Sequence, residues 1–170
     1  KDSDWYLFDP SEFPELHEKY GDGFSREYKK AKKAADEGKA KNFRVVSAKE
    51  LWKKMLKSLY ETGHPWITFK DPSNIRYSNK HEGVVHSSNL CTEILLHTKA
   101  TEYQDGEVVE VGETAVCNLA SVNLENHVKV RTLDWKKLQE TVEVAVRGLD
   151  NVIDINFYPT KEARNSNLRH

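Results

Sequence analysis

The sequence is poor in cysteine and contains no long apolar run. Two of its 170 residues are cysteine and one is methionine. No apolar stretch approaches the roughly 20 residues that a membrane-spanning helix needs. The N-terminal KDSDWYLFDP also lacks the basic-then-apolar order of a secretory signal. These absences predict a soluble, cytoplasmic protein without a membrane partner.

An excess of charge of one sign is also missing. The 26 Lys and Arg residues are offset by 27 Asp and Glu, which gives a formal net charge of −1. A nucleic-acid or membrane-surface binder would normally show a basic excess or a basic amphipathic face, so neither class of partner is expected. With 38% hydrophobic and 31% charged residues, the composition is typical of a globular protein.

Both ends of the sequence have the character of an internal segment. An apolar WYLFD begins only four residues in, no initiating methionine is present, and the last residues are NSNLRH. We therefore expect one partial domain over residues 1–170. It would contain a mainly helical lead-in over 1–63, strands with a functional loop over 64–124, and a long helix with an exit segment over 125–170.

Periodicity and turn residues predict alternating strands and helices. Ser47 and Glu50 form a capping box, and the apolar residues of the helix that they open, including Trp52 and Leu56, are expected in the core. AVCNLASVNL, apolar on both faces, is typical of a strand buried in a parallel sheet or barrel. This alternation indicates the α/β class. We expect strands at 5–8, 65–69 and 115–124, a hairpin at Asp105-Gly106, and helices at 14–20, 23–38, 47–62 and 134–153.

The stretch HSSNLCTEILLHT, residues 86–98, places a cysteine between an amide and a carboxylate. In an extended segment or tight loop, Asn89, Cys91 and Glu93 can face the same way. They would then bring a hydrogen-bonding amide, a thiol and a base together. In a helix, Cys91 would face away from the other two.

The spacing leaves other interpretations of the cysteines open. A lone cysteine is most often a small buried hydrophobic residue. A Cys91–Cys117 disulfide is disfavoured without a secretory signal. Zinc sites that combine Cys91 with His86 or His97, or Cys117 with His127, lack a close ligand pair, so no metal is expected. A Cys–His hydrolase would need a base whose placement the spacing does not define.

We expect structural rather than catalytic roles for the asparagines and histidines in the loop 71–84 and just after it. Asn74 and Asn79 are expected to satisfy loop backbone groups. His81 and His86 lie in polar sequence and are expected to be exposed to solvent.

Several motifs together resemble the catalytic (large) subunit of class I ribonucleotide reductase. They are SNLCTEI at 88–94, AVCNLASVNL at 115–124, IDINFYP at 153–159 and NSNLRH at 165–170, with DSDWYLFDP, KELW and TGHPWITFKDPSN upstream in the same order. The resemblance covers essentially the whole chain. It implies an internal piece of the family's ten-stranded α/β barrel, with an active-site finger loop.

The resemblance also implies a role for each site residue. Cys91 matches the cysteine that becomes a thiyl radical and takes the hydrogen atom from C3′ of the ribose. Glu93 matches the carboxylate that removes the 3′-hydroxyl proton, and Asn89 matches the amide that hydrogen-bonds the sugar hydroxyls. Cys117 matches one of the two thiols that reduce the substrate. Ser88 is given only a weak substrate contact.

The implied reaction converts a ribonucleoside diphosphate to its deoxy form and depends on other proteins. The family's radical comes from a metal-containing small subunit, its electrons come from a dithiol such as thioredoxin or glutaredoxin, and no cofactor is bound directly. The redox partner of Cys117 is missing from this sequence, so activity is expected only with the remaining catalytic-subunit chain or chains.

Two alternatives stay open. One is a fragment of the adenosylcobalamin-dependent reductases, although these typically have N-P-C-G-E where this chain reads S-N-L-C-T-E. The other is a non-catalytic assembly domain.

Overall fold

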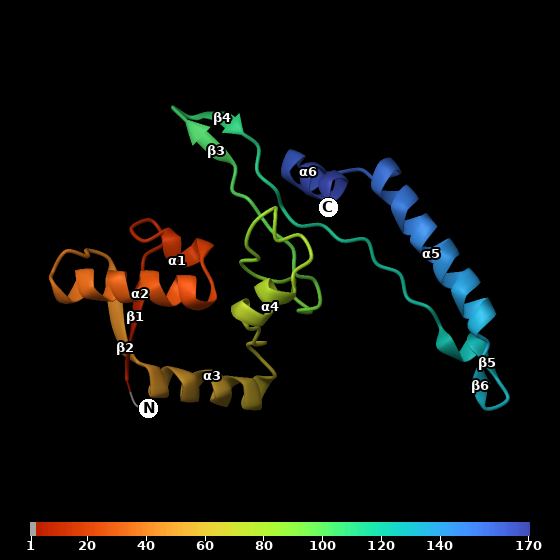
Figure 1. Ribbon diagram of the computed structural model, residues 1–170, viewed down its shortest axis with the longest axis horizontal. Coiled ribbons are helices and arrows are strands. Elements are labelled where there is room, and N and C mark those ends of the chain that lie inside the picture. The colour runs from red at the N-terminus through yellow and green to blue at the C-terminus, as the bar shows by residue number, and fades with distance from the viewer. Residues whose placement is uncertain (1–2) are drawn as a thin grey trace. The chain divides into compact units, whose positions relative to one another are not determined.

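Helices and short antiparallel strand pairs make up the part of the chain that the structure describes, residues 3–170 of a computed structural model. Residues 1–2, the start of the expected lead-in, lie outside it. The chain divides into two units, one ending at His97 and one spanning Thr98–His170 (Figure 1). No helix within residues 3–170 is both long and apolar enough to cross a membrane.

The first unit begins with a strand pair covered by a helix. Strand β1 (Asp4–Phe8) pairs antiparallel with β2 (Phe43–Ser47), and helices α1 (Glu15–Glu18) and α2 (Gly21–Asp36) lie between them in sequence. The Tyr6 backbone N–H donates to the Tyr28 hydroxyl at 2.8 Å, and the Tyr6 hydroxyl donates to Asp36 at 2.8 Å. These two bonds fix α2 against β1, so the predicted strand at 5–8 and helix at 23–38 are confirmed.

Helix α3 (Ala48–Thr62) has the predicted ends but not the predicted burial. The Ser47 hydroxyl accepts a hydrogen bond from the Glu50 N–H at 3.2 Å, and Gly63 ends the helix with a left-handed φ of 75°. No residue of α3 is buried, and Trp52 and Leu56 are 43% and 42% exposed. The prediction of a core position was therefore wrong for these two residues, because no described element covers this apolar stripe.

Residues 65–69, predicted as a strand, have no regular structure, and part of the predicted loop forms helix α4 (Lys70–Arg76). Asn74, only 1% exposed, joins this helix to the chain before the candidate site. Its amide oxygen accepts from the Val85 N–H at 2.8 Å, and its NH₂ donates to the carbonyls of Val85 and Lys70 at 3.0 and 2.9 Å. The prediction that Asn74 satisfies backbone groups is confirmed.

The second unit contains the predicted hairpin and the predicted long helix. Asp105 and Gly106, both at positive φ, connect strands β3 (Glu102–Gln104) and β4 (Glu107–Glu110), as a two-residue turn of this type requires. The Asp134 side chain accepts from the Lys137 N–H and begins helix α5. The remaining elements are η1 (Leu124–His127), β5 (Val128–Lys129), β6 (Thr132–Leu133), α5 (Trp135–Ile155) and α6 (Lys161–Arg169).

The predicted buried strand at 115–124 is wrong for this chain. Residues 115–123 belong to no strand, and Cys117 and Leu119 are exposed. A strand needs a neighbour for its backbone hydrogen bonds, and no described strand lies beside this segment. The mixture of helix and strand is as predicted, but every described strand pair is antiparallel rather than parallel.

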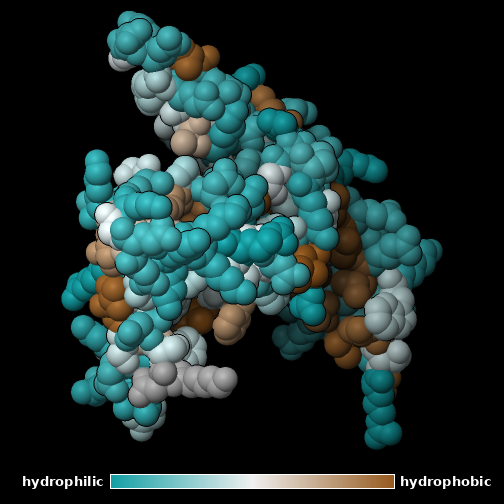
Figure 2. Space-filling view, turned by 60° about the vertical axis from the view of Figure 1, so that its left-hand side comes forward, coloured by the Kyte–Doolittle hydropathy of each residue, from teal (hydrophilic) through white to brown (hydrophobic). Residues whose placement is uncertain are grey.

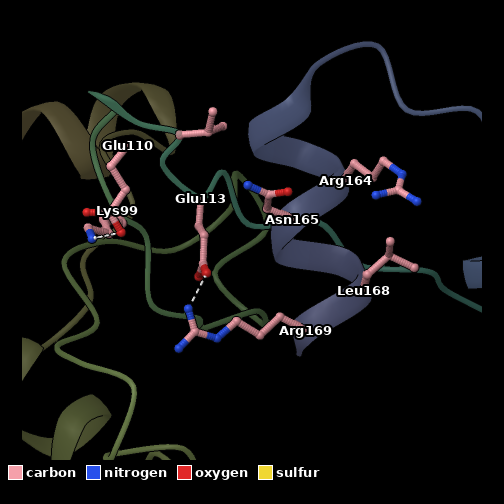
Figure 3. A pocket seen from close by; sticks show the side chains of 8 residues that line it. Lys99, Glu110, Glu113, Arg164, Asn165, Leu168 and Arg169 are labelled. Atoms are coloured by element: carbon pink, nitrogen blue, oxygen red, sulfur yellow. Dashed lines mark hydrogen bonds and ion pairs between the residues drawn. The ribbon is translucent and has the colours of Figure 1, made fainter. Parts of the chain in front are cut away.

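A buried carboxylate holds α6 in the second unit. Glu113 is 6% exposed and accepts a hydrogen bond from His170 at 2.8 Å. It accepts another from Arg169 at 2.7 Å (Figure 3). Its backbone also exchanges hydrogen bonds with Lys99. Burial by itself would raise the pKa of Glu113, but the hydrogen bonds and positive charges of His170 and Arg169 outweigh it and lower that pKa.

Replacing this carboxylate should weaken the second unit in a pH-dependent way. Since the folded-state pKa of Glu113 lies below the ordinary value of 4.5, its stabilisation is complete above that value and is lost as the pH falls through the folded pKa. We expect Glu113→Gln to cost about 1–3 kcal/mol at neutral pH and to remove this part of the acid sensitivity, measured by urea unfolding across pH.

The matched control is Glu110→Gln, because Glu110 pairs with Lys99 at the surface. Exposed pairs contribute at most about 1 kcal/mol. Equal losses in the two variants would contradict the assigned role of Glu113.

Candidate functional site

The amide, thiol and carboxylate of the candidate site lie on a closed, non-helical loop, Asn89–Ile94. The Thr92 N–H donates to the Asn89 carbonyl at 3.1 Å, and the Asn89 N–H donates to the Ile94 carbonyl at 3.4 Å. The Ile94 N–H donates in turn to the Asn89 side-chain oxygen at 3.1 Å. Asn89 therefore closes the loop with both its backbone and its side chain, and the predicted tight, non-helical conformation is confirmed.

Cys91 lies at the tip of this loop. Its thiol is free and exposed, and the neighbouring Leu90 is 94% exposed. The exposure of the thiol is contrary to the interpretation of Cys91 as a buried hydrophobic residue. It also leaves the sulfur accessible to a reaction partner, which a reactive cysteine requires.

Glu93 lines a groove, and the expectation that its side chain faces the same way as those of Asn89 and Cys91 stays a prediction. The backbone reverses at Thr92, whose φ of 66° is in the left-handed region. Beyond this residue, Glu93 borders a groove of about 360 Å³ that neither Cys91 nor Asn89 lines. The groove is lined by Pro72, Ser73, Arg76, Tyr77, Ser78, Glu93 and Leu95.

The groove contains two residues with binding chemistry that the sequence analysis did not select. Ser73 and Arg76 both lie on α4, separated by the helical spacing i, i+3. Because residues 71–84 were predicted to form a loop, this helical spacing was not recognised from the sequence. Recognising residues 70–76 as helical would have placed a hydroxyl and a guanidinium on one face, beside Glu93.

The other predicted site residues have simpler surroundings. Ser88 is half-buried, and its hydroxyl donates to the Asn89 carbonyl at 3.1 Å. Cys117 is a free, exposed cysteine in the second unit, next to Asn118, whose side chain donates to Asn167 at 3.3 Å. The convergence of Cys117 with the loop Asn89–Ile94 stays a prediction.

A second cavity, of about 450 Å³, lies in the second unit and contains neither cysteine. Two of its carboxylates are already engaged, Glu110 with Lys99 at 2.5 Å and Glu113 with Arg169 at 2.7 Å (Figure 3). We therefore assign it to the packing of α6 rather than to the candidate site. Its lining residues are Lys99, Glu110, Val111, Glu113, Arg164, Asn165, Leu168 and Arg169.

An exposed thiol on a braced loop defines a candidate thiol-dependent site, and comparison with known proteins gives the family. Residues 1–170 match the family described as "Ribonucleotide reductase, barrel domain", and the chain belongs to it. The resemblance noted in the sequence is thus confirmed, and the chain forms part of a barrel domain.

Similar proteins are named as the alpha or large subunit of ribonucleoside-diphosphate reductase. The chain is 54% identical over 166 residues to a ribonucleoside-diphosphate reductase subunit alpha of Chlamydia trachomatis and 42% identical over 168 residues to a large subunit of Danio rerio. Each match covers 98% of this chain. The chain spans only 15% and 19% of the length of these relatives.

The bond from Ile94 to Asn89 can be tested separately from chemistry. Asn89→Ala removes the acceptor, whereas Asn89→Asp keeps an oxygen in its place. Because one such bond contributes about 1 kcal/mol, we expect the Ile94 amide to exchange about fivefold faster in Asn89→Ala and to stay protected in Asn89→Asp, as measured by hydrogen exchange. The same acceleration in both variants would mean that the side-chain oxygen does not brace the loop.

Proposed function

We propose that the chain is part of the catalytic subunit of a ribonucleoside-diphosphate reductase and contributes a thiyl-radical site for making deoxyribonucleotides. The observation that carries the proposal is an exposed thiol at the tip of a loop closed by Asn89, in a chain that belongs throughout its length to the reductase barrel domain. The names of the relatives supply the substrate class, a ribonucleoside diphosphate.

The reaction begins with the transfer of one hydrogen atom. A thiyl radical at Cys91 takes the hydrogen from C3′ of the ribose, which leaves a thiol on the protein and a radical on C3′. Glu93 accepts the proton of the 3′-hydroxyl, and the 2′-hydroxyl then leaves as water with a proton from one of the two reducing thiols. The Asn89 NH₂ remains available for a sugar hydroxyl, because the loop uses only the side-chain oxygen. A fixed loop supplies the orientation that such a transfer needs.

Two thiols complete the reduction. Cys117 and a second cysteine, supplied by another part of the subunit, together give up two electrons and two protons and become a disulfide. One proton leaves in the water, the other proton and both electrons reduce the sugar, and Glu93 returns its proton to the 3′-oxygen. The hydrogen held at Cys91 then returns to C3′ and regenerates the thiyl radical. A dithiol such as thioredoxin or glutaredoxin reduces the disulfide, and a metal-containing small subunit supplies the radical.

The proposed full domain is a ten-stranded α/β barrel with Cys91 on a finger loop inside it. Exposed apolar side chains support an assembly with further parts of the subunit, since Trp135, Val144 and Ile155 of α5 are 68%, 70% and 81% exposed. Apolar side chains also reach the surface in Figure 2. A barrel would cover these faces, would supply strand neighbours for residues 115–124, and would shield the radical from solvent.

Reconstitution tests the proposal. The chain is combined with the complementary parts of a catalytic subunit, a small subunit, a dithiol and a ribonucleoside diphosphate, and the deoxynucleotide is measured by chromatography. We expect turnover that Cys91→Ser abolishes, because an alcohol does not replace the thiol as a hydrogen-atom donor and acceptor. Glu93→Gln should lower kcat by about 10²–10⁴-fold, the usual range for loss of a general base.

The matched control is Ser87→Ala, an exposed position just before the loop, which should leave turnover unchanged. Turnover by Cys91→Ser would refute the assigned radical site. Turnover with adenosylcobalamin instead of the small subunit would favour the cobalamin-dependent class. A correctly assembled complex without turnover would favour a non-catalytic assembly domain.

A further inference from the structure

A second cluster of chemically active side chains lies in the first unit and includes none of the residues assigned to the reaction. His17 and Glu18 come from helix α1, and His86 comes from the segment just before the candidate loop. Their ligand atoms all lie within 4.8 Å of one another. The Nε2 atom of His86 is 3.0 Å from a Glu18 carboxylate oxygen, and the two imidazole rings stack with centroids 4.2 Å apart.

The types of ligand atom in this cluster favour some metal ions over others. Two imidazole nitrogens and one carboxylate oxygen are the ligands that zinc takes at sites with three protein ligands, where water fills the fourth position. Magnesium and calcium prefer oxygen donors alone. The cluster thus fits a borderline-soft divalent cation of the zinc type.

His86 is held in place, whereas His17 has room to move. The His86 side chain is only 11% exposed, contrary to the prediction of a solvent-exposed residue, and it follows Val85, which Asn74 fixes through two hydrogen bonds. His17 is exposed. The rings are nearly parallel, with an interplanar angle of 5°, so a shared ion requires the exposed His17 ring to rotate until both nitrogens point at one place.

Nearby charges both help and oppose a cation. The Glu18 carboxylate supplies one negative charge directly at the cluster. The Lys70 ammonium donates to the His17 carbonyl and so holds the backbone of α1. Its positive charge, however, opposes the binding of a metal cation at the cluster. A site with one carboxylate and one neighbouring ammonium should bind zinc less tightly than a closed structural site.

We propose that His17, Glu18 and His86 form a zinc-type divalent-cation site that joins α1 to the segment preceding the loop Asn89–Ile94. The ion would link residues far apart in the sequence. It would therefore stabilise the first unit by binding the folded state alone. The proposal does not depend on the reductase reaction, because its ligands take no part in that chemistry.

The test is a Zn²⁺ titration of the full chain, kept reduced, against a chromophoric chelator. We expect one equivalent to bind and to raise the melting temperature. His86→Gln should weaken binding about tenfold or more, equivalent to about 1.4 kcal/mol. His86→Lys is the second variant, because a lysine ammonium can keep the ion pair with Glu18 but has no lone pair for a metal at neutral pH.

The matched control is His81→Gln. His81 also lies beside a carboxylate, with its Nε2 atom 3.1 Å from Glu82, but it belongs to no metal-type cluster among residues 3–170. Circular dichroism of each variant separates loss of a ligand from loss of the fold, and His86→Lys decides if His86→Gln does not fold.

Three results would overturn the site. The first is no stoichiometric Zn²⁺ binding, and the second is equal weakening by His81→Gln and by the His86 variants. The third comes from Co²⁺ as a spectroscopic probe: an intense thiolate-to-cobalt band would assign the ion to Cys91 or Cys117. A cobalt spectrum with nitrogen and oxygen ligands only, lost in His86→Lys, supports the proposal.

Discussion

The candidate site depends on the hydrogen bond that the Asn89 carboxamide accepts from the Ile94 N–H. One side-chain oxygen accepts the Ile94 N–H, while the backbone of the same residue bonds to Thr92 and Ile94. An amide can do this and still offer its NH₂ outward, whereas a carboxylate would offer only acceptors. The residue type at this position thus combines loop closure with a hydrogen-bond donor on the same side chain. The placement of the loop depends in turn on Asn74, whose hydrogen bonds fix Val85 a few residues before Asn89.

Local interactions account for most of the structure that the sequence predicted correctly. The Ser47 and Asp134 caps and the Asp105-Gly106 turn each involve residues within a few positions of one another. Such contacts need no distant partner, so their sequence signals carry over directly into structure. The tight loop around Cys91 belongs to the same group, because the hydrogen bonds that close it join Asn89 to Thr92 and Ile94.

Two of the wrong predictions share one physical cause, which is dependence on a distant neighbour. The stripe on α3 and the segment 115–124 have the patterns of buried elements, but burial and strand pairing need another element to cover or extend them. Within residues 3–170 no such element is present for either one. The partial burial of His86 was not predicted, for the converse reason. Residues of helix α1 contact this side chain, but they are remote in sequence and leave no local signal.

Thr92 gives the loop its remaining property. A β-branched residue at φ 66° costs on the order of 1–3 kcal/mol and persists only where the surroundings hold it. The hydrogen bond from its own N–H to Asn89 and the bond from Ile94 to the Asn89 side chain flank this position and offset that cost. The strained residue stands between Cys91 and Glu93, so its conformation fixes the backbone that joins these two candidate site residues. A glycine there would relieve the strain but would also allow that backbone other conformations. Strain at this position is therefore a means of holding one backbone path between Cys91 and Glu93.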